Sequence, residues 1–207
     1  MAIQRLSVLF QEWLSQDPPP PRVSLGDILQ LAGERSFGVF LAILAFPSAL
    51  PLPAPGYSTP FGLFIVIVAV QWLVGAHTPW LPARIVNASV SWEQFQSLLK
   101  VGIPWLKRLE RLTRPRFTVV VTQRVCHWLL GSLVVLMGIS MIIPIPGTNT
   151  VPAMGVFLMG FGLIEEDGLV CVAGSLVALI GATLTTSILL ALWFGGTNLL
   201  DWLKSLL

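Results

Sequence analysis

Hydrophobic residues gather in two long blocks, residues 36–83 and 127–164, and neither block contains an Asp, Glu, Lys or Arg. Each block is apolar at nearly every position, which is typical of helices buried in protein or in lipid. Prolines divide each block in two, so the pattern predicts two helical hairpins. The expected helices cover residues 37–50 and 60–77 in the first block and 128–143 and 152–164 in the second.

The break between the helices has the same form in both blocks. Leu50–Pro53 (LPLP) matches Ile143–Pro146 (IPIP), and a glycine precedes the first proline of each by 13 residues. In both blocks the break is followed by a glycine, a hydroxyl-rich turn and a proline suited to the first position of a helix. We interpret this correspondence as an internal repeat, whose motif residues are Pro51, Pro53, Gly56, Pro60, Pro144, Pro146, Gly147 and Pro152.

Helix length decides how the hairpins would lie in a bilayer. Helices of about 14 and 17 residues span about 21 and 26 Å, whereas the hydrocarbon core is about 30 Å thick. The hairpins are therefore either pairs of short spans or re-entrant loops whose tips stay inside the membrane. We favour the re-entrant arrangement, in which the broken backbone of each tip is buried in protein or faces a watery cavity.

The last apolar run, residues 169–194, holds 26 residues without a charged side chain. As a helix it spans about 39 Å, which exceeds the hydrocarbon core and predicts a C-terminal transmembrane helix. Asp167 and Gly168 precede it, and the Asp167 side chain is placed to cap its first turn.

The N-terminal region predicts two short helices. Residues 3–14 have hydrophobic side chains at helical spacing. This amphipathic helix either lies in the membrane interface or packs on the rest of the protein, and the pattern leaves both open. After a proline-rich spacer, Ser24 and Asp27 have the spacing of a capping box, which predicts a helix running toward Glu34.

A basic connector, residues 84–126, separates the two blocks. It carries eight of the twelve basic residues of the chain and an apolar stripe between Trp92 and Leu112. Pro104 is expected to split it into two helices. The stripe and the cations fit an interfacial location against anionic lipid. A pair of cytoplasmic helices that covers the membrane part is the alternative.

Composition supports an all-α membrane protein. Only 11% of the 207 residues are charged and the mean hydropathy is +0.81, whereas a soluble domain has roughly 25% charged residues. These values exclude a soluble domain and a disordered chain, and a net charge of +2 gives no reason to expect nucleic acid.

By the positive-inside rule, the N-terminus and the connector are cytoplasmic. The predicted regions are 1–35, the first hairpin 36–83, the connector 84–126, the second hairpin 127–167 and the transmembrane helix with its tail 168–207.

The candidate substrate contacts are polar side chains at the mouth of the first block, in the two tips and, for Gln71, in the middle of an apolar helix, because buried polar groups need partners. The set comprises Glu34, Arg35, Tyr57, Ser58, Thr59, Gln71, Thr148 and Asn149. We expect His77 and His127 to lie in the interface and Glu165–Asp167 to form a solvated turn. Since no catalytic or phosphate-binding motif is present and no histidine has metal-ligand spacing, we assign no catalytic residue, metal or cofactor.

Short motifs that are weak alone become specific in combination. They are Gly33–Gly38 (GERSFG), Leu50–Pro53 with Gly56, Gln71 with Gly75, Pro79–Pro82 (PWLP), Ile143–Gly147 (IPIPG) with Asn149, Pro152–Ala153 and Asp167–Gly168. Together, over roughly residues 24–195, they resemble the ExoD family of exopolysaccharide synthesis membrane proteins. The resemblance implies a multi-pass protein of the bacterial inner membrane and supplies no molecular activity. In architecture alone, the broken hairpins are also similar to those of DedA-type membrane proteins.

Three functions fit the sequence. Paired broken helices favour a transporter-like protein that moves a lipid-linked or small ionic substrate through a polar site between the two tips. The second is a scaffold or regulator of a polysaccharide synthase complex, docked on the connector. The third is a lipid-processing enzyme that uses Glu34 or Asp167. The expected partners are the bilayer, anionic lipids at the connector, further copies of the chain or the polysaccharide synthesis machinery.

Overall fold

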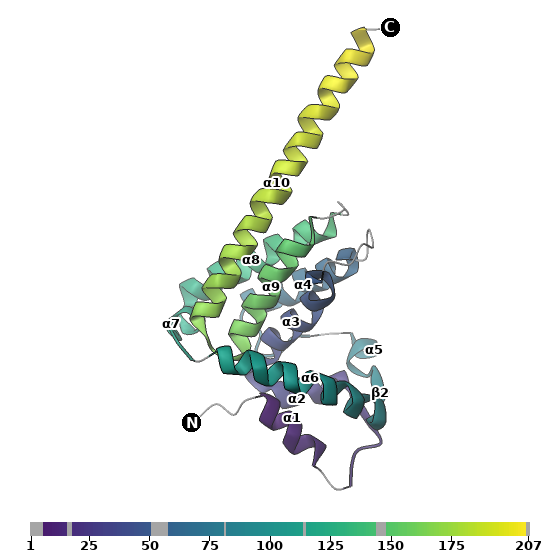
Figure 1. The fold of residues 1–207 in the computed structure, drawn as a ribbon, viewed down its shortest axis with the longest axis vertical. Coiled ribbons are helices and arrows are strands. Elements are labelled where there is room, and N and C mark those ends of the chain that lie inside the picture. The colour runs from purple at the N-terminus through teal and green to yellow at the C-terminus, as the bar shows by residue number, and fades with distance from the viewer. Residues whose placement is uncertain are drawn as a thin grey trace.

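The computed structural model describes residues 6–15, 18–50, 58–80, 82–113, 115–143 and 148–205. Almost all of its regular structure is helical, which confirms the predicted all-α class (Figure 1). In chain order the elements are α1 (Leu6–Leu14), β1 (Arg22–Ser24), α2 (Leu25–Ala32), the 3-10 helix η1 (Gly33–Arg35), α3 (Ser36–Ala49), α4 (Ser58–Leu73), α5 (Ala83–Val86), β2 (Ser89–Ser91), α6 (Trp92–Leu112), α7 (Val119–Thr122), α8 (Arg124–Ile142), α9 (Thr150–Ile164) and α10 (Gly168–Ser205).

The core is built from helix pairs that come from different hairpins. α3 lies along α9 and α4 lies along α8, while α10 packs on α9 (Figure 1). We call the contact of α3 with α9 and of α4 with α8 the seam. Its fully buried side chains include Leu41, Ile65, Met137 and Met141. The two predicted hairpins therefore form one bundle.

Glycines bring the backbones of the seam into contact. A Cβ on Gly38 of α3 would lie 2.8 Å from the carbonyl oxygen of Gly160 on α9. A Cβ on Gly62 of α4 would lie 2.8 Å from the carbonyl oxygen of Gly138 on α8. Since a side chain at either position would separate the helices, the small residues allow the close packing common in membrane bundles.

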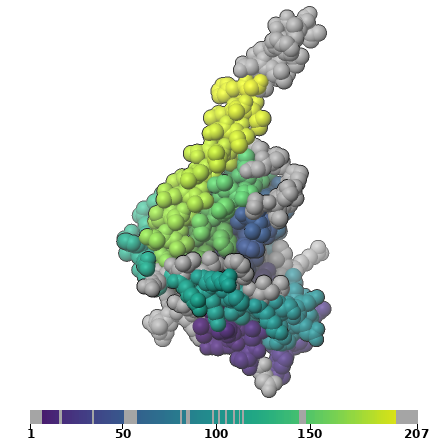
Figure 2. Space-filling view, in the orientation of Figure 1, coloured from purple at the N-terminus to yellow at the C-terminus, as the bar shows by residue number. Residues whose placement is uncertain are grey.

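An end layer of α1, β1, α2, β2 and α6 lies across one end of the bundle (Figures 1 and 2). It has its own small core around Val23, Trp92 and Phe95. The side chains of α1 pack there, with the Trp13 and Phe95 ring centroids 5.2 Å apart. Of the two positions expected for the amphipathic N-terminal helix, the structure shows the packed one.

The start of α2 confirms the predicted capping box. Ser24 N donates to Asp27 Oδ2 at 2.8 Å, and Asp27 N donates to Ser24 Oγ at 3.2 Å. The antiparallel ladder of β1 and β2, with Val23 opposite Val90, is absent from the sequence predictions. Strands of three residues are too short to leave a recognisable alternating pattern.

The predicted helix limits in the hairpins need correction. α4 and α9 begin at Ser58 and Thr150, two residues before Pro60 and Pro152. Proline is tolerated in this first turn because the N–H groups there have no intrahelical acceptor. α4 also ends at Leu73 instead of near residue 77, since Gly75 leaves the helical conformation with a φ of 83°.

Pro104 does not split the connector, contrary to the prediction. It lies inside the single helix α6, which runs for 21 residues. Trp92, Phe95 and Ile103 are buried in the half before the proline and Glu110 in the half after it, so packing holds both halves in line. This burial outweighs the cost of about 3 kcal/mol that an interior proline imposes on a helix.

Two described helices are long and apolar enough to cross a membrane: Arg124–Ile142 of α8 and Gly168–Gly195 of α10. α3, α4 and α9 are apolar but shorter, with 14, 16 and 15 residues. The distal part of α10 extends past the body of the bundle (Figure 2) and exposes Leu192, Trp193 and Phe194. Its apolar surface therefore has no protein cover among the described residues.

Candidate functional site

Polar side chains join the helix ends beside the two tips. Thr59 Oγ1 donates to Ile142 O at 3.2 Å, which links the start of α4 to the end of α8. Asn149 Nδ2 donates to Met141 O at 3.4 Å, and Thr148 Oγ1 donates to Asn149 Oδ1 at 3.3 Å. The last carbonyls of a helix lack intrahelical partners, so the bonds from Thr59 and Asn149 satisfy two carbonyls at the end of α8.

The predicted tip motifs themselves fall outside the described residues. This applies to Tyr57 and to Pro51, Pro53, Gly56, Pro144, Pro146 and Gly147, and the side chain of Glu34 is likewise outside the described part. The hydrogen bond from Thr59 nevertheless shows that the helix ends flanking the two tips are neighbours.

Buried hydroxyl groups lie at the same end of the bundle. Ser140 Oγ on α8 donates to Thr185 Oγ1 on α10 at 3.1 Å, and both residues are buried. Ser58 is buried as well, and Ser48 Oγ is buried without a hydrogen-bond partner among the described residues. Burying a hydroxyl without a partner costs free energy. We call these four hydroxyls, with Thr59, Thr148 and Asn149, the tip cluster.

Gln71 lies near the end of α4 and bonds to the chain that follows. Its Nε2 donates to Trp80 O at 3.0 Å, and its Oε1 accepts from Trp80 N at 2.5 Å. The prediction that Gln71 lies in the middle of its helix is wrong, because α4 ends two residues later, at Leu73. In this arrangement the amide fixes the Pro79–Trp80 segment against α4.

Replacing Gln71 by alanine should loosen that segment. The change removes both hydrogen bonds to Trp80, at a net cost of about 1–2 kcal/mol because the site is partly exposed to water. We expect faster hydrogen exchange of the Trp80 amide. Gln123→Ala, an exposed residue whose side chain makes no cap bond, is the control and should leave that exchange unchanged. Wild-type exchange at Trp80 in Gln71→Ala would contradict this role.

Four helix ends enclose a cavity of about 200 Å³ at the end of the bundle opposite the tip cluster. Arg35 precedes α3, Trp72 lies at the end of α4, His127 lies near the start of α8 and Glu166 follows α9. We call it the base cavity, and its lining is Arg35, Phe37, Gly38, Trp72, Val121, His127, Leu163 and Glu166.

His127 is held against the wall of the base cavity. Its Nε2 lies 2.9 Å from the carbonyl oxygen of Trp72, and the two ring centroids are 4.3 Å apart. Because a carbonyl oxygen only accepts, Nε2 carries the proton of this bond and Nδ1 is left for other contacts. The imidazole is thereby fixed in orientation between the two hairpins.

Glu166 occupies a strained backbone conformation, with a φ of 51°. The turn closes with Asp167 N donating to Gly162 O at 2.9 Å, a pattern in which glycine is the usual residue at the left-handed position. A non-glycine residue there costs roughly 1–2 kcal/mol. Strain of this kind concentrates at functional sites, so a strained carboxylate at a polar cavity is a functional candidate.

Asp167 confirms one prediction and overturns another. Its Oδ1 accepts from Leu169 N at 3.0 Å and from Val170 N at 3.4 Å, so it caps α10 as predicted. Gly168 must lack a side chain, because a Cβ there would lie 2.2 Å from the Phe117 carbonyl oxygen. The expected solvated turn is wrong at Asp167, which is buried.

The grouping of Arg35, His127 and Glu166 has no signal in the sequence. The three residues belong to different helix ends, far apart along the chain, so no motif spacing connects them. Of the three, only Arg35 was among the predicted contacts; His77, the other histidine, is exposed elsewhere. A guanidinium, an imidazole and a carboxylate in one cavity can bind ionic groups and exchange protons.

Residues 6–187 match the family model described as "Exopolysaccharide synthesis, ExoD". The chain belongs to the ExoD family. This confirms the resemblance carried by the short motifs, and ExoD membership implies involvement in exopolysaccharide synthesis. The ExoD match covers both hairpins, the base cavity and the tip cluster, and it ends within α10.

Two relatives cover most of the ExoD-family chain. It is 29% identical to Protein ExoD of Rhizobium meliloti over 170 residues, which cover 81% of this chain and 70% of that protein. It is 44% identical over 200 residues to a Synechocystis sp. protein named "Uncharacterized protein slr1875", covering 97% of this chain and 94% of that one. No solved structure matches the chain.

Proposed function

We propose that this ExoD-family protein is a multi-pass membrane protein that moves a lipid-linked or small ionic substrate for exopolysaccharide production. The observation that carries the proposal is the presence of polar groups at both ends of one apolar seam. Arg35, His127 and Glu166 line the base cavity at one end, and the tip cluster lies at the other. Ionisable residues that line cavities at membrane-embedded helices commonly mark substrate or ion pathways.

Helix lengths support the membrane part of the proposal. α8 and the first 28 residues of α10 are long enough to span. α3, α4 and α9, with 14, 16 and 15 residues, reach only about 21–24 Å. This is less than the hydrocarbon thickness of about 30 Å, and it supports a re-entrant first hairpin, formed by α3 and α4, whose tip stays within the bilayer.

The helix pairing supports an internal repeat. The first helix of each hairpin packs on the second helix of the other, and each second helix begins two residues before its proline. The flanks of both tips lie together, at the end opposite the end layer. These observations favour a parallel repeat that enters from one side, with the basic end layer cytoplasmic.

The middle of the seam is closed. Met137 and Met141 of α8 are fully buried in the core of the bundle. Methionine side chains are flexible and repack at low cost. A substrate would therefore pass by rearrangement of these side chains and of the helices that carry them, with one polar end open at a time.

Glu166→Gly separates function from stability. Glycine accepts the left-handed backbone without strain, so the variant should be more stable by roughly 1 kcal/mol. It also removes the carboxylate of the base cavity, so exopolysaccharide output in a host lacking its own copy should fall by roughly tenfold or more. The two measurements are the melting temperature of the purified protein and the polysaccharide released by the cells.

Phe117→Gly is the matched control, because Phe117 also has a positive φ, 50°, but its exposed side chain does not line the base cavity. It should gain stability and keep full output. Full output in Glu166→Gly, in Ser58→Ala and in Asn149→Ala, with no flux of lipid or ion through reconstituted protein, would refute transport. The scaffold alternative also predicts full output in these three variants and no flux. It differs in that polysaccharide output should be lost when Lys107, Arg108 and Arg111 are neutralised.

A further inference from the structure

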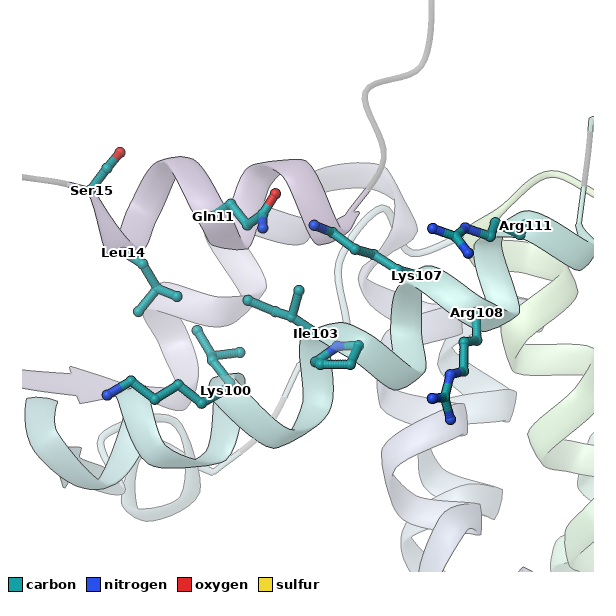
Figure 3. Close-up of a pocket in the computed structure, with 10 residues that line it drawn as sticks. Gln11, Leu14, Ser15, Lys100, Ile103, Lys107, Arg108 and Arg111 are labelled. Atoms are coloured by element: carbon teal, nitrogen blue, oxygen red, sulfur yellow. The ribbon is translucent and has the colours of Figure 1, made fainter.

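A groove of about 650 Å³ runs between α1 and α6 in the end layer (Figure 3). α6 supplies four cationic side chains and most of the apolar floor, α1 supplies Gln11 and Leu14, and Ser15 follows directly after α1. We call it the cationic groove, and its lining is Gln11, Leu14, Ser15, Leu99, Lys100, Ile103, Pro104, Lys107, Arg108 and Arg111. Its volume lies within the range of about 300–1,000 Å³ typical of small-molecule sites.

The cationic groove has cations on its rim and no carboxylate among the described residues that line it. Glu110, on the same helix, is buried and bonded to Ser7 of α1, so it does not line the groove. Lys107 and Arg111 are four residues apart on α6, where like charges repel. An anion bound between the two side chains would be attracted by both cations, and this attraction would offset their repulsion.

The floor of the groove narrows the choice of anion. Leu14, Leu99, Ile103 and Pro104 make it apolar beneath the cationic rim. An apolar floor with a cationic rim matches an amphiphile whose charged head lies on the rim. A carboxylated polysaccharide, which is polar along its whole length, would gain little from the apolar floor.

The groove also lies at the correct depth for a lipid head group. Leu9 and Phe10 of α1 and Leu106 of α6 pack against Val39 and Ile164 at the base end of the bundle. If the bundle is in the bilayer, the end layer therefore meets the head groups of one leaflet. Figure 3 shows Lys107 and Arg111 on the α1 side of α6, whereas Arg108 points toward the bundle.

We propose that the cationic groove binds the phosphate head group of an anionic phospholipid, with Lys107 and Arg111 as its main contacts. Guanidinium groups bind phosphate through paired, charge-assisted hydrogen bonds, and a lysine ammonium adds a point charge. The inference rests on the membrane placement in the proposed function. It is independent of substrate transport, because the bound lipid anchors the end layer and is not carried along the seam.

The test uses the full-length protein in detergent micelles that contain phosphatidylglycerol or phosphatidylcholine, whose choline neutralises its phosphate. Retained lipid is counted by native mass spectrometry, and protection is measured as a shift in melting temperature. Wild type should retain phosphatidylglycerol preferentially. Lys107→Gln with Arg111→Gln should weaken that binding by roughly 30-fold, the effect of two cations near an anionic lipid surface.

Arg116→Gln with Arg124→Gln is the control, because it removes the same charge from exposed residues outside the groove and should bind as wild type. Equal binding by both double variants would overturn the proposal. Equal protection of wild type by inorganic phosphate would instead assign a soluble phosphate ligand, and equal protection by alginate would assign a polyanion; either result overturns the lipid. Since no readout uses polysaccharide output, failure here is distinguishable from failure of the transport proposal.

Discussion

Gly38→Ala is expected to lower the free energy of unfolding by about 1–3 kcal/mol and the melting temperature by roughly 2–12 °C. The new Cβ would lie 2.8 Å from the Gly160 carbonyl oxygen and 3.0 Å from the Ile164 backbone nitrogen. Both are backbone atoms, so no rotamer change relieves the contact and α3 must move away from α9. Tryptophan fluorescence of the purified protein during heating measures the loss.

Gly102→Ala provides the matched control for this substitution. Gly102 lies inside α6, and a Cβ there would meet nothing within 4 Å. Alanine favours a helix interior over glycine by about 1 kcal/mol, so this variant should melt at or above the wild-type temperature. Gly62→Ala, at the crossing of α4 with α8, should behave like Gly38→Ala. A wild-type melting temperature for Gly38→Ala would mean that the helices do not cross this closely.

Glu110→Ala is expected to release α1 from α6. The Glu110 carboxylate is buried; its Oε1 accepts from Ser7 N at 2.9 Å and its Oε2 accepts from Ser7 Oγ. It thus satisfies an N–H of the first turn of α1 that has no intrahelical acceptor, and its negative charge favours that helix end. Alanine leaves both Ser7 donors buried without a partner, at a cost of about 2–3 kcal/mol to docking of α1.

Hydrogen exchange and limited proteolysis of residues 6–15 measure that release. Glu93→Ala is the control, since Glu93 is an exposed carboxylate on the same helix and should leave α1 protected. If α1 stays as protected in Glu110→Ala as in wild type, the apolar contacts of Phe10, Trp13 and Leu14 are sufficient to hold it. Such a result would assign the buried carboxylate another role.

The parts of the fold that were predicted correctly depend on residues close together in the chain. The capping box of Ser24 with Asp27, the cap of α10 by Asp167 and the four hairpin helices all follow from local spacing. The effect of Pro104 was predicted wrongly because the free-energy cost of a proline inside a helix is outweighed by the burial of α6 side chains against α1 and β1. The β1–β2 ladder was missed because each strand has only three residues.

The candidate site residues also divide into those predicted from local spacing and those that only the tertiary structure brings together. Thr59, Thr148 and Asn149 were predicted because they follow the proline breaks directly, and the structure places them at neighbouring helix ends. His127 was expected in the membrane interface and Glu166 in a solvated acidic turn, since no motif spacing links either residue to a partner in the sequence. Their shared cavity exists because α3 packs on α9 and α4 on α8, a pairing that all-apolar helices do not specify through any face of their own.

Local chemistry along the chain was thus sufficient to predict the all-α class, the apolar helices, the long last helix and the ExoD resemblance. Charge content, proline position and apolar length set these properties before any helix meets another. Which helices pair, which glycines touch and which charges share a cavity were settled in three dimensions. Backbone approach at Gly38 with Gly160 pairs α3 with α9, approach at Gly62 with Gly138 pairs α4 with α8, and the two pairings together bring Arg35, His127 and Glu166 into one cavity.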